Sequence, residues 1–142
     1  MKTTLAERLS ELLEDNYLSA AALAREIGVS DSVVAKWVRE NSSVTLSNLL
    51  KLAEYFECSA DFICGRTYEQ GKFHPFPPTF PERLLTLIKQ SGKEKGAVLK
   101  DIGLDRHALY DWKKGSMPLS TNLIALADYF GCTVDYLIGI ED

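Results

Sequence analysis

The sequence predicts an all-α protein made of two copies of one small domain, and three observations support this prediction. Residues 52–65, LAEYFECSADFICG, and residues 126–139, LADYFGCTVDYLIG, are near-repeats of each other. The repeat extends upstream, where Trp37 and Trp112 occupy matching places. Apolar residues recur at helical spacing in both copies, and no stretch alternates with the period of two that a strand requires. A repeat of this length indicates two domains of one kind.

The first copy is expected to contain five helices. Its first helix should run from about residue 3 to residue 16, where leucines recur on one face. Hydroxyl side chains that can cap a helix precede the other four, and these are Ser19, Ser30, Thr45 and Ser59. Gly28 is expected to end the second helix and Gly65 the fifth, because glycine adopts the left-handed backbone of a helix C-terminus.

The second copy is expected to repeat these helices from about Phe80 to Gly139. Apolar residues match the first copy at Leu84, Leu87, Ile88, Val98, Ile102, Leu109, Trp112, Leu123, Leu126, Ala127 and Phe130. The spacing between the copies changes by one residue between Trp37 and Leu49, so one loop there differs in length. The predicted domains are therefore 1–66 and 80–142.

The linker over 67–79 is rich in proline and aromatic residues. Prolines here and at position 81 rule out a helix interior and favour an extended, semi-rigid spacer. Phe73, Phe76 and Phe80 are not typical of a solvated linker, and we expect their rings to pack onto one or both domains. A role as a peptide ligand for another protein is the alternative.

Composition and charge exclude several functional classes. No apolar run approaches the ~20 residues of a membrane span, and the N-terminus is not that of a signal peptide, so we expect a cytoplasmic protein with no membrane partner. The net charge is −4, carried by residues 1–70, whereas residues 71–142 are neutral. An acidic chain is a poor match for DNA as a whole, so any binding to nucleic acid must use local basic clusters.

No catalytic or metal site is expected. The chain has no pairing of nucleophile and base, and Cys58, Cys64 and Cys132 lack metal-ligand spacing, so we interpret them as small buried residues. The two histidines, His74 and His107, are far apart in the sequence, which argues against a metal site. We therefore predict no enzyme activity and no cofactor.

The most informative motif is a helix, a short turn and a second helix within residues 20–37. Ala24 lets the second helix cross closely, and Gly28 permits the left-handed backbone that a three-residue turn needs. Trp37 and its counterpart Trp112 recur at core spacing, so we expect packing rather than base stacking. The first turn of the second helix remains outward, where a helix-turn-helix protein contacts the major groove.

On these residues the chain resembles the Cro/CI-type helix-turn-helix family, also called the XRE family, whose domains have a five-helix lambda-repressor-like fold. The resemblance covers both copies but not the linker. In the second copy it includes residues 112–118, WKKGSMP, and residues 134–139, VDYLIG. It implies a transcriptional regulator, a repressor, that binds double-stranded DNA sequence-specifically through two tandem domains.

The resemblance also implies which residues contact DNA. The base-reading positions fall on Asp31, Ser32, Ala35 and Lys36 in the first copy, and on Arg106, His107, Tyr110 and Asp111 in the second. Together with residues at phosphate-contacting positions, the predicted DNA-binding residues are Ser19, Ser32, Lys36 and Arg39, then Lys93, Lys95, Arg106, His107, Tyr110, Lys113 and Lys114.

The two copies differ in contact chemistry. In the first, Asp31 puts a carboxylate in the groove and Ala20 cannot reach a phosphate. In the second, Arg106 can bind guanine bidentately. Leu99, however, stands where the family has alanine, so we expect it to separate the two helices or change their angle.

Two readings of the function stay open. In one, both domains bind DNA; about 14 extended linker residues at ~3.1 Å each span roughly 43 Å, enough to join half-sites ~34 Å apart. Those half-sites would differ in sequence because the reading residues differ. In the other, one domain, more readily the first, is a degenerate interaction or dimerisation module, and DNA is bound by the second or not at all. Pairing of two chains, or a regulatory protein partner, is compatible with both.

Overall fold

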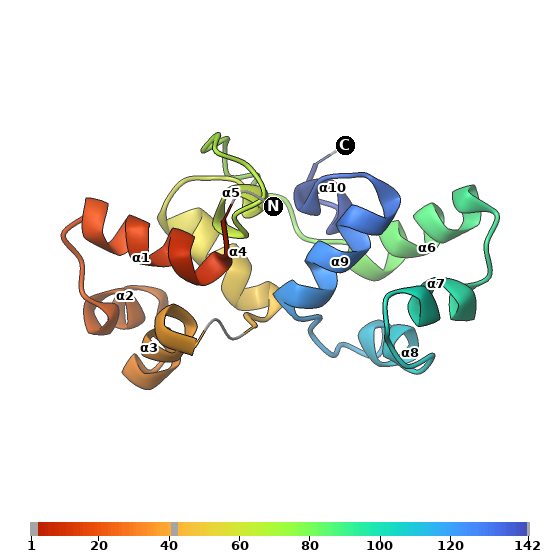
Figure 1. Cartoon of the computed structure of the whole chain (residues 1–142), viewed down its shortest axis with the longest axis horizontal. Coiled ribbons are helices and arrows are strands. Elements are labelled where there is room, and N and C mark those ends of the chain that lie inside the picture. The colour runs from red at the N-terminus through yellow and green to blue at the C-terminus, as the bar shows by residue number, and fades with distance from the viewer. Residues whose placement is uncertain (1–2, 41–42, 142) are drawn as a thin grey trace. The chain divides into compact units, whose positions relative to one another are not determined.

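The computed structural model describes residues 3–40 and 43–141, and the regular elements in this part of the chain are α-helices joined by turns and loops (Figure 1). No strand occurs within the described ranges, so the predicted all-α class is confirmed. No described helix is both long and apolar enough to cross a bilayer. The chain divides into two compact units, which we call unit 1 (residues 1–73) and unit 2 (residues 74–142).

The described residues of unit 1 form five helices. They are α1 (Leu5–Asp15), α2 (Ala20–Ile27), α3 (Asp31–Glu40), α4 (Leu46–Tyr55) and α5 (Ala60–Ile63). Ser19, Thr45 and Ser59 cap their helices through side-chain oxygens, as the sequence predicts. The expected cap at Ser30 differs, since its backbone carbonyl bonds to Val33 while its hydroxyl lies 3.3 Å from that of Ser32.

Unit 2, over residues 74–141, also contains five helices. They are α6 (Phe80–Ser91), α7 (Lys95–Asp101), α8 (Ala108–Lys113), α9 (Ser120–Phe130) and α10 (Val134–Leu137). Its core includes Trp112, which is 7 % exposed and meets the ring of Phe80 edge-on at 5.1 Å between centroids. Trp37 of unit 1 is 4 % exposed, so both tryptophans are core residues, as predicted.

A buried arginine connects the first helix of unit 1 to its last helix through hydrogen bonds. Arg8 is 3 % exposed and donates to the backbone carbonyls of Phe62, at 2.5 Å, and Thr67, at 3.1 Å. Its guanidinium carbon lies 3.9 Å from the centroid of the Phe62 ring. These bonds supply acceptors to a charge that would be costly to bury alone.

Unit 2 forms the same arginine–carbonyl hydrogen bonds and arginine–ring contact at the matching residues. Arg83 donates to the carbonyls of Tyr136, at 2.9 Å, and Glu141, at 3.0 Å. Its guanidinium carbon lies 4.2 Å from the centroid of the Tyr136 ring. Residues 7–9 and residues 82–84 both read Glu-Arg-Leu, and the arginine of each forms the same internal interaction in its own unit.

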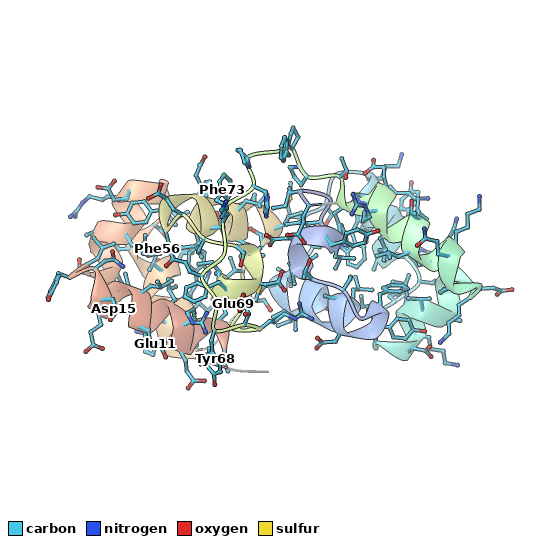
Figure 2. The ribbon with its side chains drawn as sticks, turned by 90° about the horizontal axis from the view of Figure 1, so that it is seen from above. Glu11, Asp15, Phe56, Tyr68, Glu69 and Phe73 are labelled. Atoms are coloured by element: carbon cyan, nitrogen blue, oxygen red, sulfur yellow. The ribbon has the colours of Figure 1, made fainter. Side chains whose placement is uncertain are left out.

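The predicted linker is not a free spacer. Its first part is hydrogen-bonded to unit 1, where the Ser59 amide donates to the Gln70 carbonyl at 2.9 Å. Figure 2 labels Tyr68, Glu69 and Phe73 in this part of the chain. Its last part follows unit 2, where the Thr79 amide donates to the Ile138 carbonyl at 2.8 Å. The stretch between these two attachments, residues 71–78, is shorter than the expected 14 or so extended residues.

The aromatic rings of this stretch behave differently from one another. Phe80 is buried as the first residue of α6, and Phe73 is half-buried on unit 1. Phe76 is 64 % exposed, so the expectation that it packs onto a domain is wrong. Prolines on both sides of it hold the backbone extended, which keeps the ring away from the core.

Two smaller predictions concern the cysteines and the loop of unequal length. Cys58 and Cys64 are fully buried and Cys132 is half-buried, consistent with small core residues. The change in repeat spacing falls in a stretch that includes residues 41–42, which lie outside the described residues.

Candidate nucleic-acid interface

In unit 1, α2, a three-residue turn and α3 form a closely packed pair of helices. Ser19 starts α2 by accepting from the Ala22 amide at 3.0 Å. Gly28 ends it with φ +75°, and the Val29 amide then donates to the Ala24 carbonyl at 2.9 Å. Ala24 is fully buried, and its small side chain lets α3 cross α2 closely.

The outward side of α3 carries the residues predicted to read bases. Asp31, Ser32 and Lys36 are exposed, and Ala35 is half-buried. Arg39 is also exposed, with its guanidinium 3.5 Å from the Glu40 carboxylate. The helix therefore presents two cations and a hydroxyl together with two carboxylates. The carboxylates repel the negatively charged DNA and offset the attraction of the cations.

In unit 2, the turn between α7 and α8 begins like that of unit 1 and then departs from it. Gly103 has φ +79°, and the Leu104 amide donates to the Leu99 carbonyl at 2.8 Å. The carboxylate of Asp105 then accepts from the His107 amide at 2.7 Å, a side-chain turn that delays the helix until Ala108.

This delay corrects one prediction about the site. Arg106 and His107 were expected on the first turn of a helix, but both lie in the turn before α8. They remain exposed, together with Tyr110 and Asp111 on the helix itself. The signal that sequence reasoning missed is Asp105, whose short side chain competes with helix formation at this place.

The contact between the two helices also differs from unit 1. Leu99 is 1 % exposed where unit 1 has Ala24. α2 packs extensively on α3, whereas α7 and α8 each pack on α6 and meet each other only marginally. This agrees with the expectation that a leucine at this position separates the helices.

Several basic side chains surround α8 and the start of α7. Lys113 and Lys114 are exposed at the end of α8, and Lys95 is exposed as the first residue of α7. The Lys114 ammonium lies 5.4 Å from the centroid of the Tyr110 ring, within the range of a cation–π contact.

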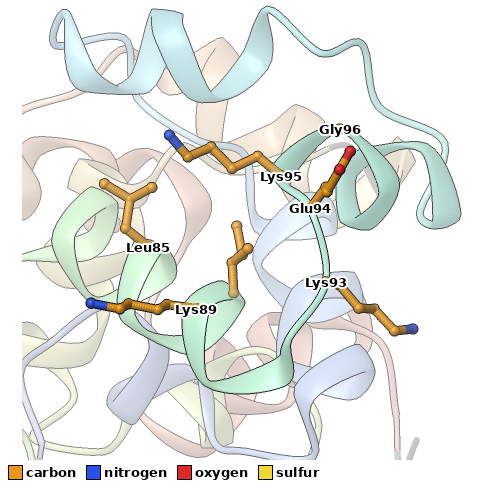
Figure 3. A pocket seen from close by; sticks show the side chains of 7 residues that line it. Leu85, Lys89, Lys93, Glu94, Lys95 and Gly96 are labelled. Carbon is orange, nitrogen blue, oxygen red and sulfur yellow. The ribbon is translucent and has the colours of Figure 1, made fainter.

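Lys93 takes part in a separate cluster. Its ammonium donates to the Tyr129 hydroxyl at 2.7 Å, and this hydroxyl donates to the Asp101 carboxylate at 2.8 Å. The Tyr129 contact, with a smaller contribution from Asp101, raises the pKa of Lys93 above its usual 10.5. Figure 3 shows the side chain of Lys93 directed away from that of Lys95, although both residues line the same groove.

A groove between α6 and the start of α7 is lined by one further lysine, Lys89, that is not among the predicted DNA-binding residues. It has a volume of about 620 Å³, its walls include Leu85 and Ile88, and Lys89 and Lys95 extend along one side of it (Figure 3). Lys89 is exposed at the end of α6. The periodicity of α6 marks only its apolar face, so nothing in the sequence singled out this lysine.

Comparison with known families gives a match within unit 1. Residues 9–63 match the family model described as Helix-turn-helix. This match supports a Cro/CI-type helix-turn-helix domain over these residues. The Cro/CI-type domain is a DNA-binding regulatory class, and the match covers α2, α3 and the turn between them. No curated protein and no solved structure matches the chain. Unit 2 lies outside the matched residues, and its membership in the same family stays a prediction.

Proposed function

We propose that the protein is a sequence-specific transcriptional repressor that binds double-stranded DNA through two tandem helix-turn-helix domains. The observation that carries the proposal is the Cro/CI-type domain of unit 1, with its close α2–α3 pair and exposed first turn of α3. That exposed turn is the part of such domains that enters the major groove.

The internal similarity of the units supports a DNA-binding role for unit 2. Arg8 and Arg83 make matching bonds, and Gly28 and Gly103 open matching turns. Around α8 the unit offers the cations for phosphates and, in Arg106, the side chain best suited to guanine. Because the exposed residues of the two units differ, the proposed operator has two non-identical half-sites.

The first experiment is a selection of the full chain against random duplex DNA, followed by titration of the selected sequence at several salt concentrations. A preferred sequence with two unlike half-sites is expected. Each phosphate contact should contribute about −0.9 to the slope of log K against log salt. No sequence preference together with a slope near zero would contradict the proposal.

A second experiment separates the contributions of the units. We expect Arg106→Glu with Lys114→Glu to weaken binding by about 100-fold or more, because one bidentate contact alone contributes ~1–3 kcal/mol of discrimination. Ser32→Ala with Lys36→Glu should weaken recognition of the other half-site. Lys51→Glu changes an exposed lysine on α4 by the same charge and serves as the control.

One observation favours a second role for unit 1. The exposed side of α1 is acidic, with Glu11 and Asp15 projecting from it in Figure 2, and Asp31 adds a carboxylate at the start of α3. We propose as the alternative that unit 1 serves as a dimerisation or protein-interaction module while unit 2 alone binds DNA. DNA affinity unchanged by Ser32→Ala with Lys36→Glu would favour this role. A dimer mass in light scattering would then favour pairing of two chains.

A further inference from the structure

Three side chains with metal-binding atoms meet in unit 2, away from the candidate DNA interface. They are His74 from the segment before α6, Asp135 from α10 and Glu141 beyond it. The His74 Nε2 atom lies 3.3 Å from Glu141 Oε2 and 3.7 Å from Asp135 Oδ2. All three donor atoms lie within 4.8 Å of one another.

The buried aspartate of this cluster has a buried counterpart in unit 1. Asp61 occupies the place of Asp135 and forms an ion pair with the guanidinium of Arg66. In unit 2 the residue matching Arg66 is Ile140, and the next residue adds a second carboxylate, Glu141. Unit 2 therefore brings two carboxylates and an imidazole together at this place, and these are donor groups that a divalent cation can bind.

The spacing of the donor atoms fits a small metal ion. Zinc binds histidine nitrogen and carboxylate oxygen at about 2.0–2.2 Å in tetrahedral geometry, which places neighbouring donors roughly 3.4 Å apart. The two distances from His74 lie close to this value. The second oxygen of Glu141, Oε1, accepts from the Thr133 hydroxyl at 3.0 Å. This bond orients the carboxylate so that Oε2 faces the histidine, as outer partners of metal ligands do.

The surroundings leave room for an ion and for water to complete its coordination. A cavity of about 450 Å³ is lined by His74, Glu141, Phe76, Gly139 and Ile140. The side chain of Asp135 is 2 % exposed, whereas those of His74 and Glu141 are 30 % and 37 % exposed. An ion can therefore reach His74 and Glu141 from the solvent side, and the buried carboxylate of Asp135 lies beside His74.

We propose that His74, Asp135 and Glu141 bind one divalent first-row transition ion, such as Zn²⁺, with water at the remaining position. One nitrogen and two oxygen donors suit such an ion better than Mg²⁺ or Ca²⁺, which prefer oxygen alone. Bound there, the ion fastens the segment before α6 to the end of unit 2. It acts in unit 2 as the Arg66 guanidinium acts in unit 1.

The test is a titration of the metal-free full chain with Zn²⁺ against a chromogenic chelator, in the absence of DNA. We expect one ion per chain with a Kd below about 10 μM, and a rise in Tm on loading. His74→Gln and Glu141→Gln should each weaken binding at least about tenfold. Both side chains are partly exposed, so circular dichroism is expected to show both variants folded.

Matched variants outside the cluster make the result specific. His107→Gln removes the other histidine, Glu82→Gln removes an exposed glutamate of α6, and Cys132→Ser removes the half-buried thiol of unit 2. Each should bind Zn²⁺ as the parent chain does. If no ion binds at about 100 μM Zn²⁺, or if His74→Gln and Glu141→Gln bind as the parent does, the proposal is overturned and the cluster is a histidine–carboxylate ion pair only.

Discussion

Unit 1 and unit 2 share the arginine contact between their first helix and their C-terminal end but differ where a helix-turn-helix domain meets DNA. The family match falls on unit 1, whose α2 and α3 pack closely around Ala24, although its exposed residues include Asp31. Unit 2 has more basic chemistry around α8, but Leu99 and Asp105 alter the spacing and start of its second helix.

The comparison shows that a regular scaffold and good contact chemistry are separable properties. The scaffold depends on buried small residues and on turn residues, whereas the contacts depend on exposed residues that packing does not constrain. An exposed contact residue can therefore change without disturbing the scaffold, whereas a scaffold change can also move the contact residues. The following predictions use substitutions that exchange or remove features of one unit at a time.

Each unit contains one tryptophan, so its unfolding can be followed separately. Trp37 reports on unit 1 and Trp112 on unit 2, and changing the other tryptophan to phenylalanine isolates each signal. Unfolding in urea, followed by this fluorescence, is the measurement for all four predictions below.

The largest effect is expected at Arg8, which is buried, and Arg83, which is half-buried. Arg8→Ala and Arg83→Ala each remove two charged hydrogen bonds to backbone carbonyls, which should lower the free energy of unfolding of that unit by about 2–4 kcal/mol. Arg25→Ala removes an exposed arginine of α2 and should change the free energy of unfolding of unit 1 by less than about 0.5 kcal/mol. If Arg83→Ala were as mild as this control, the shared internal frame of the units would be disproved.

The second effect concerns the crossing of α2 and α3. Ala24→Leu copies the residue of unit 2 into a fully buried position, and overpacking should cost unit 1 about 1–3 kcal/mol. DNA binding through unit 1 should weaken as α3 moves away from α2. The half-buried Ala22→Leu on the same helix is the control. Unchanged stability in Ala24→Leu would show that alanine is not what keeps these helices close.

A smaller effect is expected at the start of α8. Asp105→Ala removes the acceptor of the His107 amide and should cost unit 2 about 1 kcal/mol. Asp105→Asn keeps an acceptor oxygen and should retain most of this stability. Equal losses in the two variants would assign the effect to the charge of Asp105 rather than to its hydrogen bond.

The smallest effect lies at two backbone positions with positive φ. Tyr17 (φ +52°) and Glu57 (φ +53°) stand where unit 2 has Gly92 and Gly131. Tyr17→Gly and Glu57→Gly should stabilise unit 1 by about 0.5–1 kcal/mol, because both side chains are exposed and glycine relieves the left-handed strain. Gly131→Ala should destabilise unit 2 by a similar amount. A loss of stability in Glu57→Gly would mean that chain entropy outweighs strain there.

Local features of the site were predictable from the sequence because they depend on neighbouring residues. α2 begins after Ser19 and ends at Gly28, as expected. A capping side chain acts on an amide three residues away, and a left-handed turn favours glycine. The start of α8 was not predictable from the repeat. Arg106 matches Asp31 in position, but the carboxylate of Asp105 competes for the first amides of the helix.

The sequence by itself determined the all-α class, the helix caps and the burial of both tryptophans, because periodicity and capping are local properties. Only the tertiary structure decided which distant side chains meet. Lys93 binds Tyr129 instead of standing free, Arg8 and Arg83 reach the ends of their units, and His74 lies beside Asp135. These contacts follow from how the helices and the segment before α6 pack in each unit, which no spacing along the chain specifies.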